Sequence, residues 1–288
     1  MTTVARPATE VNAATPRPED RSRSMSAWRR KLLIGAVVAY AGLLILAPLT
    51  ALVSGAFADG IGASFKALSD PDVFSAFLLT LKIALITVAV HGLLGTVLAW
   101  VLVRYRFRGH WLLNGVIDLP FAVSPVVVGY MLLLLFGRTG LLAPLLESLN
   151  IKIAFAVPGM ILATLFVTLP FMAREVMPVL ESFGVEQEHA AATLGASGWQ
   201  TFWMVTFPAL RWGFIYGVIL TFARALGEFG AVLVVGGGVQ GRTETLTLFI
   251  YRALDERQYV GAYSAALVLG LLSLVLVTGT ELLRKSEK

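Results

Sequence analysis

The residues of this sequence that could do chemistry are a few charged side chains set inside long apolar stretches. Arg224 and Glu228 lie in FARALGEFGAVLVVGGG, and a spacing of four residues places them on one face of a helix. Lys82 lies in another apolar stretch and could reach a membrane surface from a helix end. Because charge inside a membrane is costly, such residues pair with each other or face a water-filled path. The second interpretation favours a path for a small anion over one for a cation or a sugar.

Two prolines interrupt a further apolar stretch, DLPFAVSPVVVG at residues 118–129. Pro120 and Pro125 each remove a helix hydrogen bond and free backbone carbonyl groups at membrane depth. The hydroxyl of Ser124 could satisfy these groups. The pattern predicts either a kinked helix that only packs or a broken helix that lines a substrate path. In the second case Ser124 and Pro125 are candidate path residues.

The composition argues against several classes of enzyme. The chain has no Cys and its three His residues are scattered, so neither thiol chemistry nor a His-built metal site is expected. There is no Gly-Lys dipeptide, and hence no phosphate-binding P-loop, and neither GxSxG nor HExxH occurs. The acidic residues are spread over the connections, whereas a membrane-embedded enzyme needs them clustered. We therefore expect no catalytic residue and no cofactor in this chain, and any energy from ATP must enter through a partner.

The elements that carry these residues are predicted to be membrane-spanning helices. The 288 residues are 57% hydrophobic and only 14% charged, which is too apolar for a soluble protein. A helix needs roughly 20 apolar residues to cross a bilayer. No segment alternates with the period of a transmembrane β-strand. The sequence predicts an all-α membrane protein with six spans, at residues 32–54, 76–103, 114–136, 154–177, 210–236 and 260–283.

The positive charges predict the orientation of these spans. Most of the 23 Lys and Arg residues precede the first span, follow the last, or fall between spans two and three and between spans four and five. Cytoplasmic connections are rich in Lys and Arg, so both termini are predicted to be cytoplasmic. Residues 1–30 have no apolar period and are predicted to be a disordered cytoplasmic tail, which leaves residues 31–288 as the membrane domain. Because the basic excess follows topology, a nucleic-acid-binding protein is disfavoured.

The connection between spans four and five contains EHAAATLGASGWQTFWMVTFP, at residues 188–208. Alanines predict a short helix over 186–194, and Gly195 follows it as a residue that needs positive φ. Ser197 and Gln200 have the spacing of a capping box, which predicts a second helix through Val205 that Pro208 ends. The alanines leave a face with little bulk, which another surface could approach closely. An interfacial hairpin that only joins two spans is the alternative.

This stretch resembles the coupling loop of the permease subunits of ABC importers. That loop reads Glu-Ala-Ala, three residues, Gly, nine residues, an aliphatic residue, one residue, an apolar residue and Pro. Here it falls on His189, Ala190, Ala191, Gly195, Val205, Phe207 and Pro208. His189 stands at the position of the family's Glu, and Glu188 precedes it, so either side chain could make the first contact. The resemblance implies that a loop at about 178–208 docks on a separate ATPase subunit through Glu188, His189, Ala190, Ala191, Gly195 and Pro208.

DLPFAVSPVV, LGASGWQTF and ARALGEFGAV together resemble the sulfate/thiosulfate branch of ABC permeases, specifically its W-type subunit, over about residues 75–280. The resemblance implies the six-helix fold of type I importers in the inner (cytoplasmic) membrane, with this chain forming half of the translocation pathway. It also implies a second permease chain, either T-type or another copy. The further implied partners are two ATPase subunits holding ATP and Mg, and an extracytoplasmic sulfate-binding protein.

The identity of the transported anion stays open at this point. Molybdate permeases carry a segment like GEFG, so molybdate and tungstate are alternatives to sulfate and thiosulfate. A secondary anion transporter that works without ATP is the alternative from another class. It predicts internal repeats, and no convincing repeat is visible in the sequence.

Overall fold

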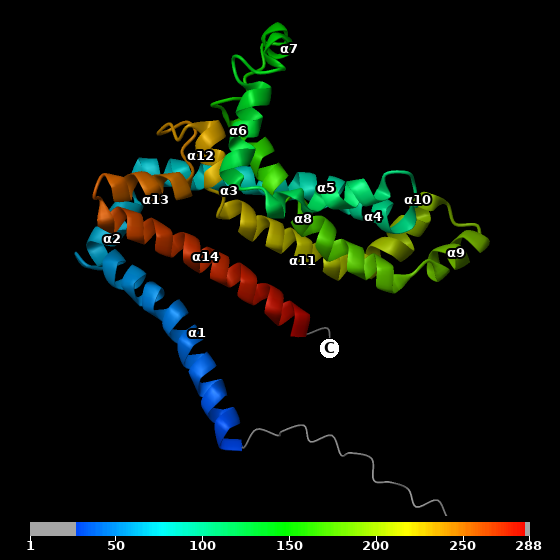
Figure 1. Cartoon of the computed structure of the whole chain (residues 1–288), viewed down its shortest axis with the longest axis horizontal. Coiled ribbons are helices and arrows are strands. Elements are labelled where there is room, and N and C mark those ends of the chain that lie inside the picture. The colour runs from blue at the N-terminus through cyan, green and yellow to red at the C-terminus, as the bar shows by residue number, and fades with distance from the viewer. Residues whose placement is uncertain (1–26, 286–288) are drawn as a thin grey trace, which may run out of the picture. The chain divides into compact units, whose positions relative to one another are not determined.

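The computed structural model describes residues 27–285, which are helices joined by turns and loops, without a strand in that range (Figure 1). Most of the predicted tail, residues 1–26, lies outside the described residues. The remaining residues of that tail, 27–30, form the first turn of helix α1 (Ala27–Ala56). Helix α1 therefore begins a few residues before the predicted start of the membrane domain at residue 31.

Helix α1 is the first candidate membrane span. The chain divides into two units after Thr50, so most of α1 belongs to one unit and the described residues from Ala51 onward form the other. Trp28–Ala56 has a mean hydropathy of 2.4. At about 1.5 Å per residue this helix exceeds the roughly 30 Å thickness of a bilayer core. The first predicted span is thus confirmed as a helix long and apolar enough to cross.

The second unit contains the remaining helices. Its first part comprises α2 (Ile61–Leu68), α3 (Pro71–Val90), the π-helical turn η1 (His91–Gly95), α4 (Thr96–Arg104), α5 (His110–Ala122), α6 (Pro125–Phe136) and α7 (Ala143–Ser148). Its second part comprises α8 (Val157–Phe183), α9 (Glu186–Thr193), α10 (Gly198–Thr201), the π-helical turn η2 (Phe202–Thr206), α11 (Phe207–Leu226), α12 (Gly230–Gly236), α13 (Leu246–Asp255) and α14 (Tyr259–Lys285).

Within the described residues, five helices are long and apolar enough to span a membrane, or six if α5 and α6 count as one broken span. The continuous ones are Trp28–Ala56, Pro71–Arg104, Val157–Phe183, Gly198–Leu226 and Tyr259–Thr280. The predicted all-α membrane architecture is confirmed. The count of six depends on the third span, which is not straight.

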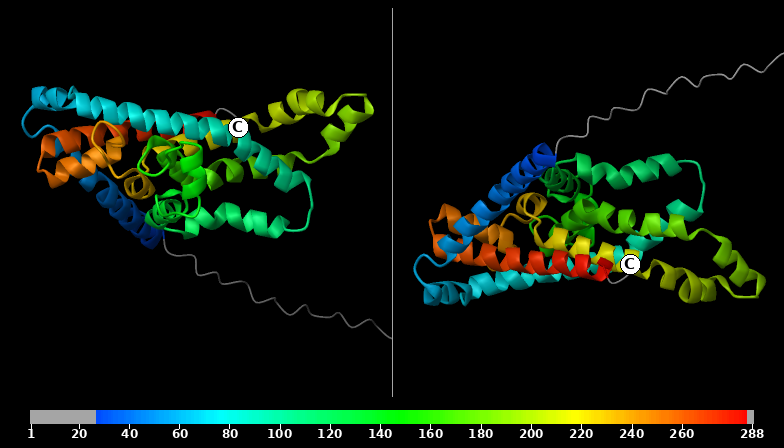
Figure 2. Two further views of the ribbon diagram at one scale, coloured as in Figure 1. Left: turned by 90° about the horizontal axis from the view of Figure 1, so that it is seen from above. Right: turned by 90° about the horizontal axis from the view of Figure 1, so that it is seen from below.

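The third predicted span bends by 113° between α5 and α6. Ser124 precedes Pro125, and a residue before proline is pushed out of the helical region; its φ and ψ are −59° and 136°. The helix therefore ends at Ala122 and restarts at Pro125, and α6 leaves the direction of α5 (Figures 1 and 2). The broken helix, rather than the kinked one, is what forms. The Ser124 side chain is exposed and does not cap the start of α6.

Helix α8 lies at the centre of the second unit, and α11 packs closely against it. Gly213 and Gly217 of α11 permit this approach, since a Cβ on Gly213 would lie 2.8 Å from Val179 Cγ2 and one on Gly217 2.5 Å from Met172 Sδ. Small residues allow helix backbones in a membrane to come close, where dispersion contacts hold them. Around this contact Met172, Val176 and Leu210 are almost fully buried.

Candidate functional site

The predicted helical hairpin forms in the connection that follows α8. Gly195 has φ of +86°, and Ala196 N–H donates to the Ala191 carbonyl at 3.1 Å, which closes α9 with a Schellman turn. Ser197 and Gln200 make both hydrogen bonds of a capping box, at 2.8 and 3.3 Å. The two short helices and the backbone role of Gly195 are therefore confirmed.

Pro208 does not end the second helix of this hairpin. Gly198–Leu226 is one continuous helix, with η2 just before Pro208. Proline lacks an N–H group and crowds the preceding turn, and a wider π-helical turn accommodates both defects. The prediction of a stop at Pro208 is therefore wrong. The second arm of the hairpin is the start of the fifth span. We call residues 186–208, which comprise α9 and this second arm, the coupling hairpin.

The tip of the coupling hairpin offers a free face with little bulk. Leu194 is 89% exposed, and His189, Ala190 and Gly195 are exposed as well. Behind the tip, Trp203 packs on Phe207 with ring centroids 5.0 Å apart, which braces the base of the hairpin. The exposed tip and braced base suit a surface that receives another protein.

Glu188 does not belong to that free face. Its Oε1 lies 3.0 Å from Arg104 Nη2, and it accepts a hydrogen bond from the Thr206 hydroxyl at 2.9 Å. The side chains of Arg104 and Glu188 are only 8% and 16% exposed. This pair is not predicted from the sequence, where Arg104 stands among the basic residues between the second and third spans. His189, one position later, is exposed to solvent.

Arg224 and Glu228 pair with each other, at 2.9 Å, as the structural interpretation predicted. Glu228 is 2% exposed, and its Oε1 accepts the Ala231 N–H at 3.0 Å, which caps the start of α12. The Thr247 hydroxyl donates to the Glu228 carbonyl at 2.8 Å. Glu228 thus ties α11, α12 and α13 together, and Arg224, with 30% of its side chain exposed, neutralises it.

The two motifs predicted to line a path meet at their breaks. Gly230 follows the end of α11, and a Cβ on it would lie 3.4 Å from Pro125 Cβ and 3.1 Å from Val126 Cγ2. The break in the third span and the break after the fifth therefore pack on each other. Irregular backbone at membrane depth occurs where protein buries it or where it lines a water-filled cavity. Lys82, in contrast, is exposed on α3.

A second intramembrane pair was missed although both residues fall in predicted spans. Arg174 of α8 donates to both carboxylate oxygens of Asp118 on α5, at 2.9 and 2.5 Å, and to the Asn114 carbonyl at 3.3 Å. Counted by its position near the end of the fourth predicted span, Arg174 reads as one of the basic residues of the connection to the fifth. Its position inside residues 154–177, opposite an acidic residue in 114–136, was the signal that could have found the pair.

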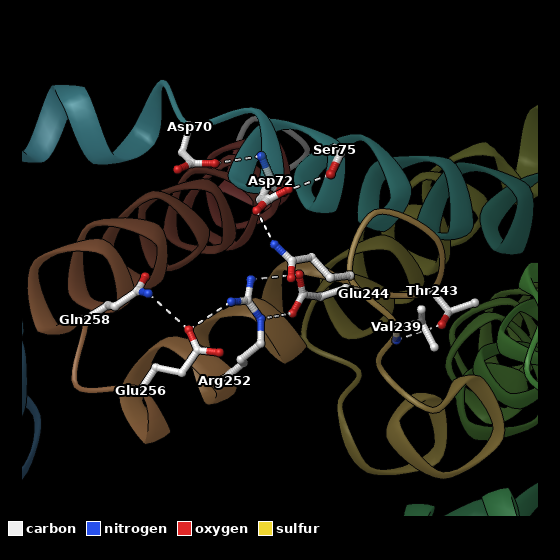
Figure 3. A network of polar contacts seen from close by, with 10 residues as sticks. Asp70, Asp72, Ser75, Val239, Thr243, Glu244, Arg252, Glu256 and Gln258 are labelled. Carbon is white, nitrogen blue, oxygen red and sulfur yellow. Dashed lines mark hydrogen bonds and ion pairs between the residues drawn. The ribbon is translucent and has the colours of Figure 1, made fainter.

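A polar cluster lies at the far end of the second unit from the coupling hairpin (Figures 1 and 3). Arg252 of α13 contacts the buried Glu244 at 2.6 and 3.1 Å and the half-exposed Glu256 at 3.0 Å. The hydrogen bonds with Glu244 raise the pKa of Arg252 above the usual value of a guanidinium. Since a raised pKa stabilises the fold below the ordinary pKa, this contribution is present throughout the physiological pH range. Gln240 also donates to Asp72, which joins the loop before α13 to the start of α3.

Removing the buried charge of this cluster is expected to destabilise the fold. Glu244→Gln should cost about 2 to 3 kcal/mol, because Glu244 is 2% exposed and its charge is matched by that of Arg252. The apparent Tm of the purified chain in detergent should fall by about 5 °C or more. Glu256→Gln is the matched control, since Glu256 pairs with the same arginine but is 44% exposed. A control as damaging as Glu244→Gln would contradict the role of burial.

The family of binding-protein-dependent transport system inner membrane components matches this chain over residues 91–286. The chain belongs to this family. The matched range contains the coupling hairpin and both broken helices, whereas α1, α2 and α3 precede it. These features of the second unit are therefore features of a transport component.

This chain is also similar to known transport proteins and to a solved structure. It is 52% identical to the sulfate transport system permease protein CysW of Synechococcus elongatus, over 84% of this chain and 85% of that protein. It is 38% identical to the sulfate transport system permease protein CysT of Escherichia coli K12, over 85% and 89%. A crystal structure of a bacterial ABC transporter that imports alginate superposes with a TM-score of 0.75 at 16% identity, covering 90% of this chain and 96% of that one. The last comparison confirms the predicted importer permease fold.

Proposed function

We propose that this chain is the permease subunit of an ATP-driven importer and forms half of the path by which sulfate or thiosulfate crosses the inner membrane. The observation that carries the choice of sulfate is the 52% identity to a sulfate transport permease over 84% of the chain. The higher identity to that CysW protein than to a CysT protein supports a W-type subunit with a T-type partner. In this proposal the chain transports the anion and is not itself an enzyme.

The other partners follow from the same proposal. Two ATPase subunits would hold ATP and Mg, because this sequence has no P-loop of its own. An extracytoplasmic binding protein would deliver the anion at the end of the second unit that carries Glu244 and Arg252. The coupling hairpin and both termini would lie on the cytoplasmic side, where positive charge is concentrated.

The continuity of the hairpin with α11 supports a mechanical role. A displacement of the exposed tip would travel along Gly198–Leu226 to the break at Gly227, where α11 meets α12 and, through Gly230, α6. Closing of the ATPase pair would thus shift the packing of the two broken helices, and an interface with two discrete packings can switch the side from which a path is open. Arg224 stands four residues before Glu228 at this place and would lower the cost of an anion in a low-dielectric path.

Uptake of labelled sulfate by cells with and without the gene tests this function. Deletion should abolish ATP-dependent sulfate uptake, and excess unlabelled thiosulfate should compete in the undeleted cells whereas molybdate should not. The control is a deletion strain that carries the gene on a plasmid. Unchanged sulfate uptake in cells with no other sulfate system would contradict the proposal, and competition by molybdate alone would assign the chain to molybdate or tungstate.

A further inference from the structure

The ion pair of Arg104 and Glu188 joins four elements at one point. Arg104 is the last residue of α4, and its Nη1 donates to the Leu180 carbonyl near the end of α8 at 3.1 Å. Its Nη2 contacts Glu188 of α9 at 3.0 Å. The same carboxylate oxygen accepts from the hydroxyl of Thr206 in η2 at 2.9 Å. One guanidinium and one carboxylate therefore link the second, fourth and fifth spans to the first helix of the coupling hairpin.

The link is well protected from water. With side chains 8% and 16% exposed, the two charges interact in a medium of lower dielectric constant than water, where a charge-assisted hydrogen bond is strong and a lone charge is costly. Arg104 Nε is buried without a partner, so the guanidinium is held by its two contacts at Nη1 and Nη2. Such a group holds α9 in one place relative to α4, where a flexible surface pair would not.

The link also explains how the hairpin divides its residues between two jobs. Glu188 faces inward to Arg104 and Thr206, whereas the next residues, His189 and Ala190, face solvent. The tip can then contact an ATPase subunit without disturbing the inward side. Without Arg104, Glu188 would keep its hydrogen bond from Thr206 of η2, but α9 would lose its link to α4.

We propose that Arg104 is a positioning residue that fastens α9 to the second span, so that the hairpin, the end of α4 and the base of α11 move as one body. This inference rests on the proposed function, because the displacement is the one that an ATPase partner drives. The movement of the tip then reaches α3 and α4 directly, and not only the fifth span to which the hairpin is continuous.

A spin-label distance within the assembled transporter tests this directly. The chain has no native Cys, so two introduced cysteines are its only labelling sites. Gln187→Cys on α9 and Arg106→Cys beyond α4 are suitable because both positions are exposed. The label–label distance should be the same in the nucleotide-free and ATP-trapped states. A shift between the two states larger than the width of the distribution would overturn the proposal.

A double variant provides the functional test. Arg104→Met/Glu188→Leu removes both charges, which avoids the lone buried charge that either single variant would leave. The label–label distance should now change on ATP trapping. The sulfate carried per ATP hydrolysed should fall about ten-fold, which corresponds to a coupling free energy of about 1.4 kcal/mol. Arg108→Met/Glu181→Leu is the control, because it makes the same two types of substitution, and so removes one positive and one negative charge, at exposed positions at the same end of the unit.

The outcomes separate this inference from the proposed function. Normal sulfate transport per ATP in the Arg104→Met/Glu188→Leu variant would overturn the positioning role while the function stands. An unaltered transporter that assembles and hydrolyses ATP but carries no sulfate would contradict the function. In that case the label–label distance would still test whether the hairpin and the end of α4 move as one body.

Discussion

Gly195→Val is expected to reduce sulfate uptake about ten-fold or more while the transporter still assembles in the membrane. Gly195 has φ of +86°, and a β-branched residue in this region costs roughly 1 to 3 kcal/mol of strain. Apart from the two adjacent residues, no described residue has an atom within 4 Å of a Cβ placed on Gly195, so a clash with a neighbouring segment of the described chain does not contribute. The strain would open the Schellman turn and misplace the exposed tip. Uptake of labelled sulfate, normalised to the amount of chain in the membrane, is the measurement.

Gly198→Val is the matched control for this substitution. Gly198 lies three residues further on, and a Cβ there also meets open space, but its backbone does not have positive φ. It occupies the first position of α10. The control should transport within about two-fold of the unaltered chain, since surface substitutions seldom exceed 0.5 kcal/mol. Equal transport by both variants would show that the turn at Gly195 is not a tight coupling element.

Arg224→Ala is expected to abolish uptake and also to lower the amount of folded chain. The variant leaves Glu228, which is 2% exposed, without its counter-charge, and an uncompensated buried charge costs about 3 to 5 kcal/mol. The amount of chain extracted from membranes and its apparent Tm measure the stability. Sulfate uptake measures the effect on the path.

A second variant separates the structural from the transport role of Arg224. In Arg224→Ala/Glu228→Gln the amide oxygen can still accept the Ala231 N–H, and no lone charge remains. This variant should recover folded chain close to the unaltered amount, but uptake should stay low because the cation is missing from the path. Recovery of uptake together with stability would leave Arg224 with the pairing role alone.

Those parts of the fold that depend on local sequence signals could be predicted. Long apolar runs place the spans, because burial in lipid requires them whatever the tertiary contacts. Gly195, Ser197 and Gln200 place the hairpin, because a positive φ and a capping box act within a few residues of the chain. The family, with the partners it implies, came from the resemblance of three motifs rather than from these physical signals.

What could not be predicted depends on contacts between distant residues or on the sum of several local preferences. Arg104 finds Glu188 84 residues away, and Arg174 finds Asp118 56 residues away, and neither pair leaves a periodic pattern in the sequence. Proline usually breaks a helix, which predicts a stop at Pro208, but the π-helical turn η2 accommodates it. The predicted fifth span, residues 210–236, begins after this proline and so lies too far along the chain. The helix in the structure begins at Gly198 and ends at Leu226.

Import of sulfate by this chain can be measured as sulfate accumulation by the purified transporter in lipid vesicles, with this chain, its permease partner, the ATPase subunits and the binding protein present. We predict that labelled sulfate accumulates only when ATP and Mg are supplied on the side of the ATPase subunits, and that omission of this chain abolishes it. Accumulation of sulfate that is independent of ATP, or equal without this chain, would contradict the account.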